Sequence, residues 1–187
     1  MLKVLVIPED FRNDQYILRP LFRRLFRSLK RNAKVEVLMD PLLGGVGEAL
    51  NAERLAEVVK QYAMVDLFIL CVDRDGVAAR HQRLAAIEQE FGNPARRFLA
   101  ESAWEEIETW VLAGISLPDD WHWADVRSEV HVKETYFDPL AQQRGVADGP
   151  GRGRKSLGEE ASRNIGAIRQ KCREDFDRLA ERIGLTA

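Results

Sequence analysis

An uninterrupted apolar run at residues 67–72 (LFILCV) constrains the fold of this chain more than any other part of its sequence. Such a run is typical of a strand that is covered on both faces, as at the centre of a parallel sheet. It ends abruptly in the polar sequence Asp73, Arg74, Asp75, Gly76. Sheets of this kind hold their functional groups just beyond the carboxyl ends of the strands. We therefore expect this turn to be part of a functional site.

Strands and helices alternate along the first half of the chain, and a helix ends it. The predicted strands are residues 2–7, 34–39, 67–72 and 97–100. Apolar residues at helical spacing predict helices between these strands, then a helix at 101–113 and one long helix over 165–183. The alternation predicts an α/β fold, with a parallel sheet sandwiched by helices and a long C-terminal helix.

The chain of 187 residues has the size of one domain. We expect residues 1–114 to form its core and residues 115–187 to form an extension with a basic loop and the final helix. Two cysteines are too few for a disulfide scaffold, and no run approaches the ~20 apolar residues of a membrane span. The N-terminus, apolar and then acidic, reads as a strand and not as a signal peptide. We therefore expect a cytoplasmic protein that does not enter the membrane.

Acidic residues follow two of the predicted strands. Glu9 comes after the first strand, and Asp73 and Asp75 come after the third. If these strands are parallel neighbours, the three carboxylates meet at one edge of the sheet, where their repulsion favours a bound cation. Oxygen ligands suit Mg²⁺ or Mn²⁺. The alternative is that Asp73 caps the next helix and Asp75 is merely solvated.

A second acidic group occupies residues 101–108. Glu101, Glu105 and Glu108 have the spacing of one helical face, and Glu106 lies beside them. Like charges at this spacing are mildly unfavourable, which suggests a cation or a basic partner. A plain solvated helix face explains the pattern as well.

Basic residues gather near a glycine-rich segment, although the whole chain has a net charge of −2. Arg144, Arg152, Arg154 and Lys155 predict a mobile basic loop that positions a phosphate backbone. The net charge excludes a protein held to nucleic acid by bulk charge alone, so any such contact needs a local patch. For the arginines of the first helix, we favour a solvated face over a nucleic-acid track.

The acidic end of the first strand, the Asp-x-Asp of the third and the strand–helix alternation together resemble the Toprim fold. Topoisomerases, bacterial primases and OLD-family nucleases share that fold. Residues 106–113 (EIETWVLA) look like the Glu-x-Glu-x-Trp-leucine-alanine signature of small stand-alone Toprim-like bacterial proteins. Residues 131–134 (HVKE), the basic loop and the final helix resemble the C-terminal half of that group.

The resemblance implies roles for individual residues. Glu9 would serve in acid/base chemistry, and Asp73 and Asp75 would bind Mg²⁺ or Mn²⁺. Glu106 and Glu108 are further candidate metal ligands. The family usually has Gly after the first Glu, whereas this chain has Asp10, which would either crowd the site or add a ligand.

We therefore expect a Mg²⁺- or Mn²⁺-dependent, nuclease-type hydrolase that processes phosphodiesters in phage defence or DNA maintenance. OLD-family nucleases carry an ATPase domain that this chain lacks, so any ATPase partner would be a separate chain. Self-association into a homo-oligomer is compatible with the sequence.

Two other classes of protein stay open. One is a non-catalytic partner subunit of a defence or DNA-maintenance complex. The other is a receiver-like switch module, phosphorylated on Asp73. Such a module normally needs a lysine at the end of its last strand, and no predicted strand supplies one.

Overall fold

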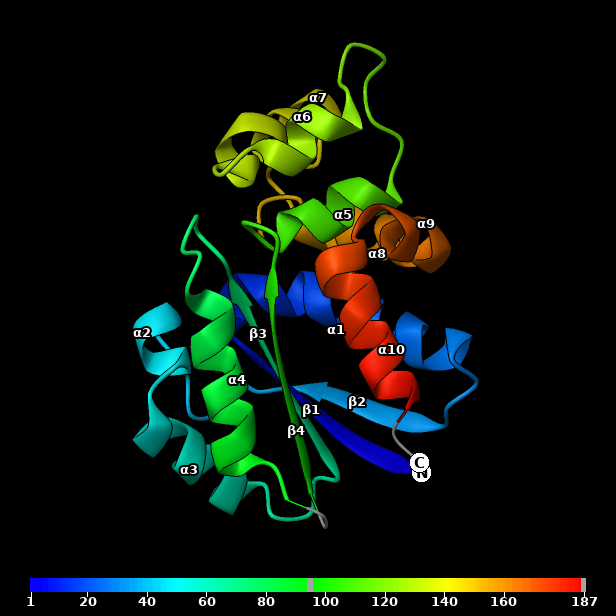
Figure 1. Cartoon of the computed structure of the whole chain (residues 1–187). Helices are drawn as coiled ribbons and strands as arrows, with labels where there is room; N and C mark the ends of the chain where they lie inside the picture. The colour runs from blue at the N-terminus through cyan, green and yellow to red at the C-terminus, as the bar shows by residue number, and fades with distance from the viewer. Residues whose placement is uncertain (94–95, 186–187) are drawn as a thin grey trace.

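The computed structural model describes residues 1–93 and 96–185, and a sheet of four parallel strands lies at their centre (Figure 1). The strands are β1 (Leu2–Pro8), β2 (Ala33–Val37), β3 (Leu67–Asp73) and β4 (Arg97–Ala103). They lie in the order β2-β1-β3-β4, so β1 and β3 are central. The predicted α/β class and parallel sheet are confirmed, and the apolar run at 67–72 forms a central strand as expected.

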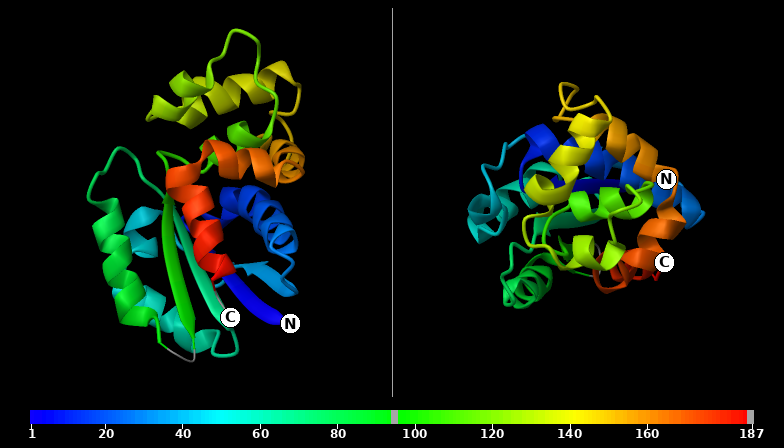
Figure 2. Two further views of the ribbon diagram at one scale, coloured as in Figure 1. Left: turned by 45° about the vertical axis from the view of Figure 1, so that its right-hand side comes forward. Right: turned by 90° about the horizontal axis from the view of Figure 1, so that it is seen from above.

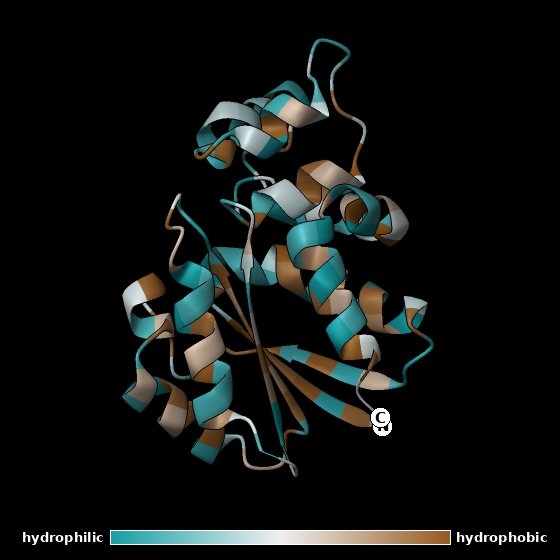
Figure 3. Ribbon diagram, viewed as in Figure 1, coloured by the Kyte–Doolittle hydropathy of each residue, from teal (hydrophilic) through white to brown (hydrophobic). Residues whose placement is uncertain are grey.

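The central strands are apolar on both faces because each face meets its own hydrophobic cluster. In β3, Leu67, Ile69 and Cys71 face one cluster, and Phe68 and Leu70 face the other. Successive side chains of a strand point to opposite faces, so only a continuous apolar run can fill both clusters. Figure 3 shows the inner strands largely in the brown of hydrophobic residues.

Helices cover both faces of the sheet (Figure 2). The helices of the described residues are α1 (Phe11–Ser28), α2 (Val46–Ala49), α3 (Ala52–Gln61), α4 (Arg80–Phe91), α5 (Glu108–Gly114), α6 (Trp123–Ser128), α7 (Asp138–Gln143), α8 (Arg154–Ser162), α9 (Ile165–Lys171) and α10 (Arg178–Gly184). Two short π-helical segments, η1 (Lys133–Phe137) and η2 (Arg173–Asp177), connect some of them. Helices α2, α3 and α4 pack on one face, and α1, α8, α9 and α10 pack on the other. Helices α5, α6 and α7 lie beyond the carboxyl ends of the strands (Figure 1).

Helix α1 packs closely against α8 where α1 has a proline and α8 has a glycine. Pro20 lies inside α1 and has no N–H to donate to the carbonyl of Tyr16. In α8, Gly158 faces this carbonyl, and a Cβ at Gly158 would lie 2.6 Å from the Tyr16 oxygen. The missing side chain therefore lets the two helices approach, which anchors the C-terminal extension on α1.

The helix predicted over residues 101–113 is wrong in its first half. Strand β4 continues through Ala103, paired with β3, and α5 begins only at Glu108. Glu101 is a buried strand residue whose carboxylate accepts hydrogen bonds from Arg178 at 2.5 and 2.9 Å. The i, i+4, i+7 spacing of the glutamates therefore does not mark a helical face, because a strand and a turn precede the helix.

The C-terminal helix is present, but it is interrupted at Cys172, which has a non-helical backbone with φ −117° and ψ 60°. The change of direction after α9 brings Asp175 and Phe176 into the core. The Asp175 carboxylate accepts hydrogen bonds from the Trp104 N–H at 2.8 Å and from the Trp110 indole at 2.7 Å. A buried carboxylate needs such partners, so the helix bends to supply them.

No helix in the described part of the chain has the length and apolar character that a membrane crossing requires. The longest, α1, has 18 residues and carries five arginines between its buried positions. Its apolar side chains, among them Leu21, Phe22 and Leu25, are instead buried against the sheet.

Candidate metal site at the carboxyl ends of the strands

The pairing of β1 with β3 brings the first two acidic segments together. The two strands are parallel, with Pro8 opposite Cys71. The next residues on each side are therefore neighbours at the same edge of the sheet. The Asp73 N–H donates a hydrogen bond of 3.3 Å to the Glu9 carboxylate. Glu9 and the Asp-x-Asp segment are therefore in direct contact, as the sequence predicted.

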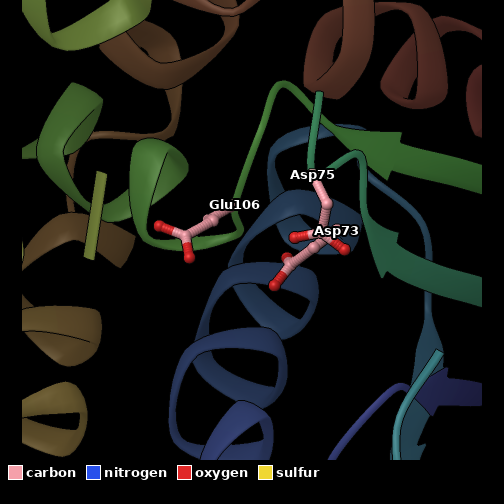
Figure 4. A group of neighbouring side chains, drawn as sticks. All are labelled: Asp73, Asp75 and Glu106. Atoms are coloured by element: carbon pink, nitrogen blue, oxygen red, sulfur yellow. The ribbon is translucent and has the colours of Figure 1, made fainter. Parts of the chain in front are cut away.

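Three carboxylates lie within reach of one ion. Asp73, Asp75 and Glu106 each offer an oxygen, and these oxygens lie within 4.8 Å of one another. Figure 4 shows Asp73 and Asp75 side by side after β3, with Glu106 on the segment that leads into α5. Glu9 lies next to this group but is not among the three residues that come together.

The turn that holds Asp75 is fixed by Glu105. The Glu105 carbonyl oxygen accepts the N–H groups of Arg74 at 2.7 Å and Asp75 at 3.2 Å. Its carboxylate accepts the Gly76 N–H at 2.5 Å and the Arg74 guanidinium at 2.9 Å. Asp75 and Gly76 both have positive φ, 51° and 67°, a conformation that glycine adopts without strain. Glu105 therefore positions the turn between the two aspartates and the helix that follows.

Backbone N–H groups orient the other two carboxylates. One oxygen of Asp73 accepts the Ile107 N–H at 2.9 Å, and one oxygen of Glu106 accepts the Lys133 N–H at 2.6 Å. Asp73 therefore caps the segment before α5, and not the helix next in sequence as the alternative interpretation supposed. In each carboxylate, the second oxygen takes no part in these two hydrogen bonds.

Burial and mutual repulsion raise the pKa values of these acids. Burial is the main cause for Asp73, whose pKa lies well above its usual range, and the charges of Glu108, Glu9 and Asp14 add to it. Burial also raises the pKa of Glu106 to about 7, although the Lys133 N–H opposes the shift. Negative charge in this site is therefore unfavourable until a cation balances it.

The donor set fits a hard divalent cation. Carboxylate oxygens are the ligands that Mg²⁺, Mn²⁺ and Ca²⁺ prefer, and Mg²⁺ commonly takes one or two of them while keeping water. Asp75 is exposed and Asp73 is partly exposed, so an ion held here would still face solvent or substrate. Both cysteines are buried and neither belongs to the group of Asp73, Asp75 and Glu106, so the donors of this group are oxygen alone.

Asp14 is an acidic member of this region that the sequence analysis missed. It lies in the first turn of α1, and its carboxylate accepts the Asp10 N–H at 2.8 Å. Burial raises its pKa to about 8, with the charges of Glu108, Asp10 and Glu9 adding to the shift. Asp10 itself caps α1 by accepting the Arg12 N–H at 2.9 Å, so it neither crowds the site nor joins the three ligands. The sequence offered one indication of this position: Asp10 and Asp14 are four residues apart, directly after the first strand.

Asp14→Asn should make the stability of the metal-free protein less dependent on pH. Between the unfolded pKa of about 3.9 and the folded value of about 8, the folded state holds one more proton, so stability falls as pH rises. An asparagine cannot ionise and still accepts the Asp10 N–H. From pH 5 to pH 9 the variant should gain on the order of 2–4 kcal/mol relative to wild type.

Urea unfolding in EDTA at the two pH values measures this gain. Asp120→Asn, in an exposed loop, is the matched control and should follow the wild type. A constant difference between Asp14→Asn and wild type at both pH values would contradict the protonated state of Asp14.

Glu108 and Arg154 require a correction. Glu108 is predicted as a metal ligand and Arg154 as a substrate-binding residue, but the two form a buried ion pair with each other. Arg154 also donates to the Gly151 carbonyl at 2.9 Å and lies over the Phe137 ring. The arginine lies inside the protein because α8 begins at this residue and turns its side chain toward α5.

The other basic residues of the predicted loop lie nearer the surface. Arg144 pairs with Glu160 at 2.9 Å and donates to the Ser116 carbonyl. Lys155 is exposed and pairs with Glu159 at 3.0 Å. Arg152 is exposed and belongs to a turn, with φ 55°. A role for Arg144, Arg152 and Lys155 in substrate binding stays a prediction.

No family model matches the chain, and no curated protein or solved structure is significantly similar to it. The resemblance to Toprim-like proteins therefore rests on the short motifs of the sequence. The function of the site has to follow from its own geometry and chemistry.

Proposed function

We propose that this protein is a Toprim-like, metal-dependent enzyme that hydrolyses phosphodiester bonds with one Mg²⁺ or Mn²⁺ ion. One observation carries the proposal: oxygens of Asp73, Asp75 and Glu106 lie within 4.8 Å of one another at the carboxyl edge of a parallel sheet. Direct oxygen–metal contacts are about 2.0–2.6 Å long, so one ion between these oxygens can contact all three.

A cation at this position supplies the chemistry that phosphodiester hydrolysis needs. If Asp73, Asp75 and Glu106 hold a divalent cation, it would supply Lewis-acid chemistry toward a phosphoryl oxygen and toward the water that hydrolysis consumes. Asp75 is exposed, so the substrate has access to the ion. The three ligands come from two segments that the Glu105 turn holds together, which favours a fixed geometry.

Glu9 is the residue we assign to proton transfer. It lies beside Asp73 but is not one of the three clustered ligands, and burial raises its pKa above the usual value. A carboxyl group with a raised pKa is a better general base near neutral pH than an ordinary glutamate. Arg80 donates to Asp75 across 3.4 Å and interacts electrostatically with Glu9, so it limits the excess of negative charge.

The receiver-like alternative has less support. The last strand, β4, ends at Ala103 and is followed by Trp104, Glu105 and Glu106, with no lysine at the position such modules use. Asp73 also accepts the Ile107 N–H, which occupies one of the oxygens that a phosphoryl donor would approach. A non-catalytic subunit that retains the metal site remains the second candidate, and a separate ATPase chain would be its natural partner.

Calorimetric titration with Mn²⁺ and a hydrolysis assay test the proposal together. The wild-type protein should bind one Mn²⁺ ion and hydrolyse bis(4-nitrophenyl) phosphate, and EDTA should abolish the hydrolysis. Glu106→Gln should weaken Mn²⁺ binding at least tenfold, because a charged ligand is lost, whereas Asp120→Asn should have no effect. Absence of Mn²⁺ binding would refute the proposal. Binding without hydrolysis of this or any nucleic-acid substrate would favour the non-catalytic subunit.

A further inference from the structure

Helix α1 carries arginines that have no partner in the described part of the chain. Arg12, Arg19, Arg23, Arg24 and Arg27 form no ion pair, side-chain hydrogen bond or ring contact there. Several arginines in other elements do have a carboxylate partner, as in the pairs of Arg169 with Asp177 and Arg182 with Glu88. After Asp14, α1 contains no acidic residue at all. Unbalanced positive charge is therefore concentrated on one helix of a protein whose net charge is −2.

Four of these arginines form a line along the helix. Positions 12, 19, 23 and 27 fall on one side of a helix with 3.6 residues per turn, opposite the buried Leu18, Leu21 and Leu25. The first and last arginines are 15 positions apart, which is about 22 Å at a rise of 1.5 Å per residue. It begins at the end of α1 that adjoins Glu9 and Asp14, so it leads away from the acidic site.

A hollow with aromatic walls lies beside this line. Its volume is about 320 Å³, and Phe11, Arg19, Arg23, Met39 and Tyr62 are among the residues that line it. Phe11 and Tyr62 are both only partly buried. Glu36 also lines the hollow, but its carboxylate pairs with Lys34 at 2.6 Å, so it does not neutralise the arginines.

A plain solvated face does not account for this arrangement. Arginines four residues apart, such as 19 with 23 and 23 with 27, repel each other and destabilise the helix that carries them. Arg12 lies at the positive end of the helix dipole, where a cation is unfavourable. The adjacent hollow adds aromatic surface to the positive charge. Arginines that follow a backbone, together with aromatic rings on which bases stack, are the elements by which proteins bind single-stranded nucleic acid.

We propose that the arginine line of α1 and the hollow beside it bind a single strand of nucleic acid and lead it to the acidic site. The proposal rests on the proposed function for its direction, since the strand would reach the metal at the start of α1. Arg12, Arg19, Arg23 and Arg27 would contact phosphates, and Phe11 and Tyr62 would stack on bases. This proposal differs from the solvated-face interpretation favoured from the sequence, and the two predict different results for the arginine variants.

Fluorescence anisotropy with a labelled 16-nucleotide single-stranded DNA tests the proposal in EDTA, where cleavage is absent. The triple variant Arg19→Gln, Arg23→Gln, Arg27→Gln should lose at least tenfold in affinity at 50 mM NaCl. Its slope of log affinity against log salt should fall by about 2, since each phosphate contact in a single strand contributes about 0.7.

The control is a second triple variant with the same change of charge. Arg54 in α3, Arg83 in α4 and Arg163 at the end of α8 are exposed and do not belong to α1. Their replacement by glutamine should leave the affinity and the salt slope unchanged. Circular dichroism checks that both variants fold. Phe11→Leu, which retains an apolar side chain, should weaken binding two- to tenfold.

Unchanged binding by the α1 triple variant, or no binding by the wild type, would overturn the strand-binding surface. A duplex of the same sequence bound more tightly than the single strand would overturn the single-strand assignment. Hydrolysis of bis(4-nitrophenyl) phosphate by the wild-type protein needs no extended surface, so it reports on the proposed function alone. The two proposals can therefore fail separately.

Discussion

Asp73→Asn should lower the metal-dependent turnover of a phosphodiester substrate by about three decades, because the metal's contribution to the transition state is several kcal/mol. The asparagine keeps the size of the side chain and still accepts the Ile107 N–H, so the turn should stay in place. The variant loses one charged ligand, and the remaining Asp75 and Glu106 hold a cation less tightly. The loss should appear mainly in kcat.

The measurement is the initial rate of hydrolysis at saturating Mn²⁺, with the melting temperature recorded for each variant. Asp120→Asn, an exposed substitution with the same change in charge, serves as the control and should retain full activity. Removing a carboxylate whose pKa is raised in the folded state should not lower the stability of the metal-free protein. Equal rates for Asp73→Asn and wild type would mean that the observed activity belongs to a contaminating nuclease.

Arg154→Met should destabilise the protein by about 3–5 kcal/mol, because it leaves the Glu108 charge buried and unpaired. Such a loss is a large part of the stability of a typical domain. The pair joins α8 to α5, the helix that follows Glu106, so its loss should also loosen the position of Glu106.

Urea unfolding at pH 7 measures the effect, and Arg152→Met provides the comparison. Arg152 is two residues away and exposed, so its substitution should change stability by no more than about 0.5 kcal/mol. Adding Glu108→Gln to Arg154→Met should recover part of the loss, since the amide has no charge to bury. A loss below about 1 kcal/mol for Arg154→Met would contradict the stabilising role of this buried ion pair.

The sequence alone was sufficient for the sheet and for one part of the site. An apolar run needs cover on both faces, so residues 67–72 could only form a central strand, and β3 occupies that position. The residue after such a strand lies at the carboxyl edge, which places Asp73 and Asp75 there without further information.

Local patterns misled wherever a distant contact decided the conformation. Glu101, Glu105 and Glu108 have helical spacing, but strand pairing with β3 extends β4 through Ala103 and overrides it. The apolar period of the last segment continues past Cys172, yet the partners of the Asp175 carboxylate interrupt the helix. Propensity is a weak preference, and tertiary contacts of this strength regularly exceed it.

Only the tertiary structure could decide which charged side chains of the site become partners. The sequence determined that acids follow β1 and β3, and the Toprim resemblance made Glu106 and Glu108 equal candidates to join them. It did not determine that Glu106 would lie with Asp73 and Asp75 while Glu108 would pair with Arg154. These partners lie between 31 and 46 residues apart along the chain. A carboxylate acts on whatever lies within a few ångströms, and the distance between two residues in space is set by how the helices pack. Most strands and helices of this protein thus follow from neighbouring residues in the sequence, whereas the chemistry of its site depends on how the folded chain packs.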